Sequence, residues 1–404
     1  MLTPRIGGAV LLAALVALVT LPACSSTSGP SANLATGCVK HYDAATDYFP
    51  DKAVVGESVG FSVTYHRNYK VVTNTQPSTG SRARLTYVLV QCGTPKPALT
   101  GALRNARVVT IPVHRVVTMS TTYLPMLDAL GATSVLAGVD NFDYVNTASV
   151  RSLIAAHKLR AVGNGAQANL ELLASIAPDL VMTQSTGDES TDGIDRMQKA
   201  GTNVVVNSDW LEQAPLGRAE WVKFISLFVN KEGLAARVFE GIATRYRALA
   251  RRATATRSRP GVIMNVPFQG TWFVPGGNSF SARLIRDAGG AYPFSYDHST
   301  GGLSLDLEAV FSKAGNADVW LADDPTFASL AAARKVDSRF ADFAAFKSGN
   351  VWNNDKIVNK AGGNDFFETA ALRADELLAD LIEVLHPELE HGHVTVWFRK
   401  IPPG

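Results

Sequence analysis

The chain has 404 residues, of which 46% are hydrophobic and 18% are charged, and its formal net charge at neutral pH is +2. This composition is typical of a globular protein that is long enough to form two or three domains. Because the chain is nearly neutral, its charge gives no reason to expect nucleic acid as a partner.

The first residues predict export through a membrane. A single charged residue, Arg5, precedes an apolar run over 7–21 that consists almost entirely of Ala, Val, Leu and Gly. A membrane span needs roughly twenty apolar residues, so this run of about fifteen favours a secretory signal peptide over a permanent span. We expect the signal peptide to occupy residues 1–23.

The end of the apolar run predicts a lipid anchor. It reads Leu21-Pro22-Ala23-Cys24, which resembles the bacterial lipobox, a motif in which the cysteine is acylated and the chain is cut just before it. Acyl chains give membrane affinity through their buried methylene groups. Residues 24–36 would then form a lipidated stalk, and its Ser, Gly and Pro residues indicate flexibility. The expected location is extracytoplasmic, on the outer face of the cell membrane, with the lipid on Cys24.

The remaining two cysteines are Cys38 and Cys92. Export places them in an oxidising compartment, where a disulfide persists, and only one pairing is available once Cys24 carries the lipid. Two buried free thiols remain the alternative. Between the cysteines lie three runs typical of β-strands, at 61–65, 69–73 and 85–90. Together these features predict a small β-rich module over residues 37–105.

From residue 116 onward, short apolar runs alternate with helical segments. This alternation predicts βαβ units and a mostly parallel sheet. The predicted strands form two series, at 116–119, 135–139, 179–182 and 203–206, and at 261–266, 318–321 and 350–352. A long helix over 365–385 is expected to follow the second series, with a lone strand at 394–398.

Helical periodicity over residues 219–255 separates the two series, because apolar residues recur there at three- and four-residue spacing. The expected fold is therefore α/β, with two Rossmann-like lobes joined by a single long helix, plus a small N-terminal β module. The predicted boundaries are 106–225 for the N-terminal lobe, 226–258 for the connecting helix, 259–390 for the C-terminal lobe and 391–404 for a tail.

Several segments over residues 113–390 match a known family in order and spacing. They are Asn169-Leu170-Glu171 with Ala177-Pro178-Asp179-Leu180-Val181, Gly276-Gly277-Asn278-Ser279-Phe280, Leu303-Ser304-Leu305-Asp306-Leu307-Glu308, Lys347-Ser348-Gly349-Asn350-Val351-Trp352 and Leu385-His386-Pro387-Glu388-Leu389. With them the chain resembles the periplasmic binding proteins that deliver iron–siderophore complexes, haem or cobalamin to ABC importers. The resemblance implies a ligand held in the cleft between two lobes, and it does not extend to residues 37–105.

Glu171 and Glu308 each lie in the first turn of a predicted helix, one in each lobe. Acidic residues are favoured there by the helix macrodipole alone, so the residues by themselves allow a purely structural role. The resemblance implies a second role, because in the family one glutamate per lobe docks onto arginines of a dimeric ABC permease. Carboxylate–guanidinium pairs suit docking because they are bidentate and directional.

Candidate ligand-binding residues come from the loops that follow predicted strands, because ligands of open α/β sheets bind outside the carboxyl ends of the strands. Aromatic side chains with polar edges suit large, flat or partly charged ligands. The selected residues are Tyr123, Tyr144, Gln184, Trp210, Trp272, Tyr296, His298, Trp352 and Asn354; the same loops also contain Asp140, Asp323 and Asp324. No arginine stands out among them, which favours a neutral or cationic ligand such as a hydroxamate complex or a cobalamin-like macrocycle.

Three other functions are alternatives to a receptor for metal complexes: a metal-ion receptor, an enzyme and an adhesive surface protein. A zinc or manganese receptor needs several histidines that converge on one ion, and of the eight histidines only His298 lies in a predicted cleft loop. An enzyme is disfavoured because the G-x-G-x-x-A match at 163–168 follows a poor strand. An adhesive surface lipoprotein, with the β module as its working part, remains open. We expect no catalytic residue, no metal site and no resident cofactor.

Overall fold

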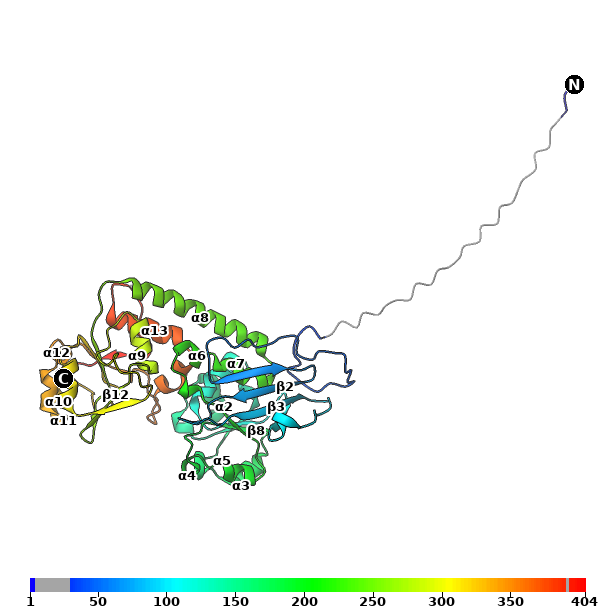
Figure 1. The fold of residues 1–404 in the computed structure, drawn as a ribbon, viewed down its shortest axis with the longest axis horizontal. Helices are drawn as coiled ribbons and strands as arrows, with labels where there is room; N and C mark the ends of the chain where they lie inside the picture. Colours follow the sequence, from blue (N-terminus) through cyan, green and yellow to red (C-terminus); the bar gives the residue numbers. More distant parts are fainter. Residues whose placement is uncertain (4–29, 390–391) are drawn as a thin grey trace.

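The computed structural model describes residues 1–3, 30–389 and 392–404. Cys24 and nearly all of the predicted signal peptide lie outside these residues. Within the described part of the chain, every helix is too short or too polar to cross a membrane. Figure 1 shows two α/β lobes, with the helix α8 (Glu232–Ala255) running along both of them.

The N-terminal lobe is built on a parallel sheet in the order β7-β6-β5-β8-β9. Its strands are β5 (Val116–Thr118), β6 (Leu136–Val139), β7 (Arg160–Ala161), β8 (Leu180–Thr183) and β9 (Val204–Val206). The helices α1 (Leu124–Ala129), α2 (Ala148–Ala155), α3 (Leu170–Ile176), α4 (Glu189–Asp192) and α5 (Ile194–Lys199) lie between them in sequence. The predicted α/β alternation is confirmed. The strand order reverses at β5, whose neighbours are β6 and β8.

The C-terminal lobe has a second sheet in the order β10-β14-β15-β16. Its strands are β10 (Val262–Met264), β14 (Val319–Leu321), β15 (Val351–Asn353) and β16 (Arg399–Lys400), of which only β16 is antiparallel to its neighbour. A small antiparallel sheet contains β11 (Pro267–Phe268), β12 (Thr271–Pro275) and β13 (Gly302–Leu305). The helices are α9 (Phe280–Asp287), α10 (Leu307–Ala314), α11 (Leu330–Val336), α12 (Ala344–Lys347) and α13 (Ala374–Leu385).

The tail forms its strand later than predicted. The expected strand at 394–398 is absent, and β16 at Arg399–Lys400 pairs with β15 instead. The buried carboxylate of Asp380 accepts hydrogen bonds from the backbone N–H groups of Val396 and Trp397. These bonds occupy the backbone donors that a strand would use, so the tail is fixed to α13 before it joins the sheet.

The predicted helix over 365–385 is shorter than expected, because only α13 is an α-helix. Residues Asp365–Phe367 and Thr369–Ala371 form two 3-10 turns instead. The polar side chains of this segment are buried and bonded to distant parts of the chain. The carboxylate of Asp365 accepts a bond from the Trp397 indole N–H at 2.9 Å, and Glu368 bonds to the other lobe. These tertiary contacts override the helical pattern.

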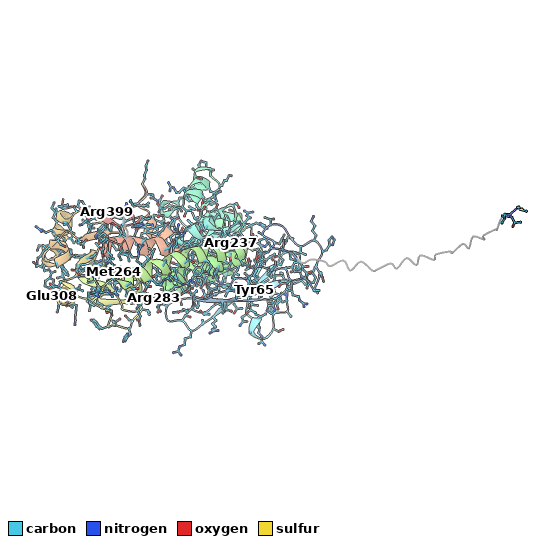
Figure 2. All side chains as sticks on the ribbon, turned by 90° about the horizontal axis from the view of Figure 1, so that it is seen from above. Tyr65, Arg237, Met264, Arg283, Glu308 and Arg399 are labelled. Atoms are coloured by element: carbon cyan, nitrogen blue, oxygen red, sulfur yellow. A yellow bond between two sulfur atoms is a disulfide. The ribbon has the colours of Figure 1, made fainter. Side chains whose placement is uncertain are left out.

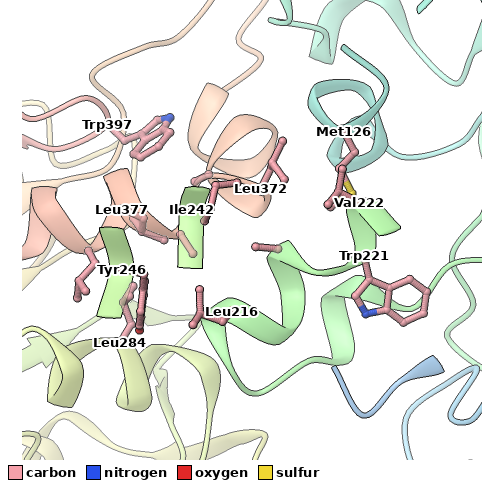
Figure 3. Packing of buried hydrophobic residues seen from close by; sticks show 14 of the residues in the cluster. Met126, Leu216, Trp221, Val222, Ile242, Tyr246, Leu284, Leu372, Leu377 and Trp397 are labelled. Carbon is pink, nitrogen blue, oxygen red and sulfur yellow. The ribbon is translucent and has the colours of Figure 1, made fainter. Parts of the chain in front are cut away.

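The long helical pattern over 219–255 also contains a break. Helix α7 (Trp221–Val229) ends at Asn230, which has a left-handed φ of 54°, and α8 begins at Glu232. All nine residues of α7 are buried, so α7 is a core helix, preceded by the short α6 (Pro215–Ala219). Figure 3 shows Ile242 and Tyr246 of α8 packed beside Leu377 and Leu284. Helix α8 therefore ties the core of the C-terminal lobe to α7, and α6 also packs against α9 and α13.

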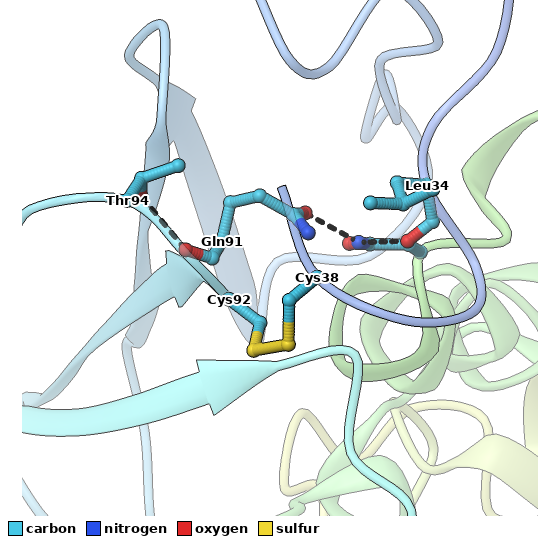
Figure 4. Close-up of a disulfide and its surroundings, with 6 residues drawn as sticks. Leu34, Cys38, Gln91, Cys92 and Thr94 are labelled. Carbon is cyan, nitrogen blue, oxygen red and sulfur yellow. Dashed lines mark hydrogen bonds between the residues drawn. A yellow bond between two sulfur atoms is a disulfide. The ribbon is translucent and has the colours of Figure 1, made fainter. Parts of the chain in front are cut away.

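The N-terminal module is a four-stranded sheet in the order β1-β2-β3-β4. Its strands are β1 (Phe61–Tyr65), β2 (Tyr69–Asn74), β3 (Leu85–Gln91) and β4 (Arg107–Ile111). The last of these is parallel to β3 and extends the sheet beyond the predicted boundary at 105. The Cys38–Cys92 disulfide is formed, as predicted, and joins the start of the module to the end of β3 (Figure 4).

A buried ion pair fastens this module to the break between α7 and α8. Lys70 of β2 and Glu232 at the start of α8 form a salt bridge, and both side chains are completely buried. The Lys70 ammonium group also donates to the carbonyl oxygen of Leu227 at 2.9 Å and to the side-chain oxygen of Asn230 at 2.7 Å. Burial lowers the pKa of Lys70 to about 8, and Glu232 opposes the decrease. The module thus supplies, through Lys70, a donor for the Leu227 carbonyl oxygen and the Asn230 side chain at the break between the helices.

The second link between the module and the lobe is a carboxylate held by backbone amides. Glu220 accepts hydrogen bonds from the N–H groups of Glu57 and Ser58, each at 2.7 Å. Phe61 of β1 packs on Trp221 with ring centroids 4.9 Å apart. The module therefore shares one hydrophobic core with the N-terminal lobe.

The two lobes also touch directly at the base of the space between them. Glu368 of the C-terminal lobe accepts hydrogen bonds from the N–H groups of Asn146 and Thr147, at 2.6 and 2.8 Å, and from the Thr147 hydroxyl. Thr147 precedes the first residue of α2, so the glutamate lies at the positive end of that helix. Burial raises the pKa of Glu368, and these donors oppose the rise. We call this contact the interlobe latch.

Next to the latch, the backbones of the two lobes lie close together at Gly363 and Asp143. A Cβ atom at Gly363 would lie 2.5 Å from the carbonyl oxygen of Asp143 in the other lobe, so any larger residue would push the lobes apart. Asn359 donates from its amide group to the carbonyl oxygens of Asp143 and Val145. The latch therefore joins the lobes in addition to α8 and to the packing of α6 against α9 and α13.

Replacing Lys70 with Ala should lower the free energy of unfolding by about 3 to 5 kcal/mol, because Glu232 would remain buried without its partner. Denaturant titration measures the loss. Lys52→Ala is the matched control, since Lys52 pairs with Asp47 on the surface, and it should cost less than about 1 kcal/mol. Equal effects of the two substitutions would contradict the structural role of the buried pair.

Replacing Glu368 with Ala should destabilise the chain by about 3 kcal/mol, because three donors lose a charged acceptor. Amide hydrogen exchange at Asn146 and Thr147 should also accelerate. Glu376→Ala, which removes a half-exposed ion pair with Arg373, provides the control and should change stability by less than about 1 kcal/mol. Unchanged exchange at Asn146 and Thr147 in Glu368→Ala would rule out the latch.

Candidate ligand-binding cleft

A cleft of about 750 Å³ lies between the two lobes. In the N-terminal lobe it is lined by residues that follow β5, β6 and β8, which are the strands at the reversal of strand order. A reversal of this kind opens a crevice because the loops on either side of it leave in opposite directions. The residues from these loops are Met119, Ser120, Thr121, Asp140, Tyr144 and Gln184, and Asn164 joins them from the loop after β7.

The other wall follows β14 and β15 of the C-terminal lobe. It contains Asp323, Asp324, Pro325, Asn354, Asp355 and Val358, and the loop that carries the latch adds Gly362, Gly363, Asn364 and Phe367. The floor of the cleft thus belongs to the same segment that joins the lobes. The volume is within the range of sites for small organic molecules and cofactors.

The side chains of the C-terminal wall are held in place by asparagines. The Asn354 amide group donates to Asp323 at 2.7 Å, and Asn353 both accepts from the N–H group of Asp324 and donates to its carbonyl oxygen. Asp323 has a left-handed φ of 49°, a conformation that non-glycine residues adopt at a cost and that is frequent at binding sites. Asn354 fixes the direction of the Asp323 carboxylate, and Asn353 fixes the backbone of Asp324.

Partial loss of hydration raises the pKa of two of the cleft carboxyl groups. Asp323 is accessible from the cleft, but the walls around it displace bulk water and raise the pKa of its carboxyl to about 6, with a further contribution from Asp324 and Asp355. Asp140, on the opposite wall, is 7% exposed, and burial raises its pKa too. Desolvation disfavours a carboxylate that has no cationic partner, so both groups would be stabilised by a nearby positive charge.

The structure brings together only part of the predicted ligand-binding set. Tyr144, Gln184 and Asn354 line the cleft. Tyr123 and Trp272 are completely buried: the Tyr123 hydroxyl donates to the Asn207 carbonyl oxygen, and Trp272 stacks on Trp320. Neither presents a surface to the cleft.

The other four predicted residues lie outside the cleft lining. Trp210, Tyr296 and His298 are exposed elsewhere. Trp352 is half-buried and donates from its indole to Asn350, beside a different surface depression that also contains Arg259.

The loops that line the cleft were predictable from the sequence, but the predicted binding residues were mainly aromatic side chains and not carboxylates. Asp140, Asp323 and Asp324 stood in the identified loops, yet only the structure shows that they converge. Asp355 was not singled out at all, although it directly follows the run 352–354. The available signal was that these four aspartates all come shortly after strands, namely β6, β14 and β15.

The two predicted docking glutamates are exposed and belong to different lobes. Glu171 lies in the first turn of α3, whose N-cap is Asn169, and Glu308 in the first turn of α10, whose N-cap is Asp306. They differ in one respect, since Glu308 forms an ion pair with Arg339 at 2.6 Å. In Figure 2, Glu308 lies at the end of the molecule opposite Tyr65 of the module.

Known proteins share this architecture. The model of the periplasmic binding protein family matches residues 116–357. An uncharacterised lipoprotein of Methanocaldococcus jannaschii is 28% identical over 305 residues, which are 73% of this chain and 70% of the relative.

Two solved structures have the same fold. A periplasmic haem-binding protein of Vibrio cholerae aligns with a TM-score of 0.54 at 17% identity, and a possible iron-binding solute-binding protein of Staphylococcus epidermidis with 0.54 at 18%. Each alignment covers 68% of this chain and 99% of the other. Since the family match covers more than half of the 404 residues, this chain belongs to the periplasmic binding protein family.

Proposed function

We propose that this protein is the extracytoplasmic solute-binding component of an ABC importer. It binds an iron–siderophore or cobalamin-like complex in the interlobe cleft and delivers it to the permease. The observation that carries the proposal is the 750 Å³ cleft at the strand ends of both lobes, where ligands of open α/β sheets bind. The Vibrio cholerae and Staphylococcus epidermidis structures, described as haem-binding and possibly iron-binding, support a ligand of this size.

The proposed location follows from Cys24 and from the relatives. The matching Methanocaldococcus jannaschii proteins include two named as lipoproteins. A lipid on Cys24 would hold the receptor at the outer face of the cell membrane beside its permease. Tethering of this kind raises the effective concentration of receptor at the permease without any additional contact.

The mechanism needs no covalent chemistry. The ligand enters the cleft, and the lobes adjust only slightly, because α8 and the interlobe latch both connect them. The loaded receptor then docks through Glu171 and Glu308 onto arginines of a permease dimer. One carboxylate per lobe lets the permease sense both lobes at once, and hence the state of the cleft between them.

Isothermal titration calorimetry of the full-length protein in detergent tests the receptor function. The panel contains ferric hydroxamate and catecholate complexes, haem, cobalamin, and free zinc and manganese ions. We expect one organic complex to bind with a dissociation constant of about 1 μM or less. Binding of zinc or manganese alone would replace the proposal with a metal-ion receptor, and no binding by any member would refute it.

The double substitution Glu171→Ala, Glu308→Ala should abolish cellular uptake of the complex identified in this way, while its dissociation constant stays within about twofold of the native value. The control is Glu240→Ala, an exposed glutamate in the middle of α8, which should leave uptake unchanged. Uptake is measured with radioactively labelled complex. Normal uptake by the double variant would remove both glutamates from the docking site.

A further inference from the structure

We propose that the interlobe cleft selects a complex with net positive charge, recognised by aspartate side chains from both lobes. This inference rests on the proposed receptor function and specifies its ligand class. Asp140 contributes from the N-terminal lobe, and Asp323, Asp324 and Asp355 contribute from the C-terminal lobe. Among the described residues that line the cleft there is no Lys, Arg or His.

The protein's own cationic side chains neutralise only one of these four aspartates. Asp355 pairs with Arg399 of β16 at 2.7 Å, so this one carboxylate is neutralised by the protein itself. Asp324 accepts from the N–H group and the hydroxyl of Thr326, and Asp323 accepts from Asn354. These donors are neutral, so three carboxyl groups in the cleft lack a cationic partner among the described residues.

Asp140 supports the proposal in a second way, because one of its carboxyl oxygens is buried without a hydrogen-bond partner among the described residues. It is 7% exposed, and its Oδ1 atom has no hydrogen-bond partner within the described part of the chain. An unpartnered buried polar atom costs roughly 1 to 3 kcal/mol, so native proteins rarely contain one without a reason. Because the Asp140 side chain lines the cleft, a cation on the ligand would offset the cost of burying this carboxylate.

The shape and charge together narrow the ligand class. The neutral part of the wall, which includes Tyr144, Asn164, Gln184 and Phe367, suits the body of a metal chelate. The carboxylates suit an ammonium group or a positively charged metal centre attached to it. Haem, with two carboxylates, and ferric catecholate complexes, with net negative charge, would be repelled by the same wall.

Three ferric hydroxamates that differ in one terminal group test the proposal. The ferric complex of desferrioxamine B carries one positive charge, its N-acetyl derivative is neutral, and its N-succinyl derivative carries one negative charge. Titrated into the full-length protein in detergent, the cationic complex should bind about tenfold more tightly than the neutral one, and the anionic complex should bind least. Equal affinities, or tighter binding of the anion, would overturn the proposal.

Two variants assign the preference to the cleft. The double substitution Asp140→Asn, Asp323→Asn should bring the cationic and neutral complexes to within about twofold of each other. Glu240→Gln on α8 removes the same kind of charge outside the cleft and should leave the preference intact. Thermal unfolding verifies that the double variant is folded; if it is not, Asp323→Asn alone should at least halve the preference. A preference that survives in folded variants would contradict the assignment.

The pH dependence gives a second readout. Asp323 faces Asp324, Asp355 and Asn354 on its own wall, and Arg399 pairs with Asp355. The pKa of Asp323 is raised to about 6, so its carboxylate is present above this pH and becomes protonated below it. Affinity for the cationic complex should therefore fall as the pH decreases from about 7.5 to about 5.5, while the neutral complex should be unaffected. Parallel changes for both would count against the proposal.

The outcomes also separate this inference from the receptor function. If haem or an anionic complex binds at submicromolar concentration and the cationic hydroxamate does not, the charge class is wrong and the receptor function stands. If no organic complex binds and cells show no uptake, the receptor function fails, and the inference fails with it.

Discussion

The buried ion pair between Lys70 and Glu232 stabilises the junction between α7 and α8, and the placement of the second lobe depends on that junction. Helix α7 is a core element of the N-terminal lobe, whereas α8 extends out of it and carries the C-terminal lobe (Figure 1). A change of direction between them would move the whole second lobe. The β module supplies Lys70, so a segment that lies far from the cleft in the fold helps to set the cleft's width.

The connections between the lobes set the geometry of the cleft. Helix α8 fixes their separation on one side, and the latch at Glu368 joins them at the floor of the cleft. Lobes connected in this way should change their separation little, so the proposed recognition would depend on side chains that are already in position. The asparagines behind Asp323 and Asp324 provide this preorganisation, which reduces the ordering cost of binding.

The strands and helices of the lobes were predictable because each follows a local hydrophobic pattern. The breaks were not. The junction at Asn230, the 3-10 turns at 365–371 and the late strand β16 each result from a buried polar side chain that bonds to a distant residue, namely Lys70, Glu368 and Asp380. Such bonds leave no periodic signal. The same holds for the site. The loops that line it could be predicted from the strands they follow, but the convergence of the aspartates depends on how the two lobes face each other.

The ion pair between Glu308 and Arg339 has a thermodynamic consequence for the proposed docking. A permease arginine that approaches Glu308 would replace a partner that the receptor already supplies, whereas Glu171 forms no salt bridge within the described part of the chain. The exchange at Glu308 swaps one guanidinium for another, so it adds orientation with little net free energy. Attachment would then draw its affinity from the N-terminal lobe and its register from the C-terminal lobe. If the protein is the proposed receptor, such docking would let it release from the permease after each delivery and collect another ligand.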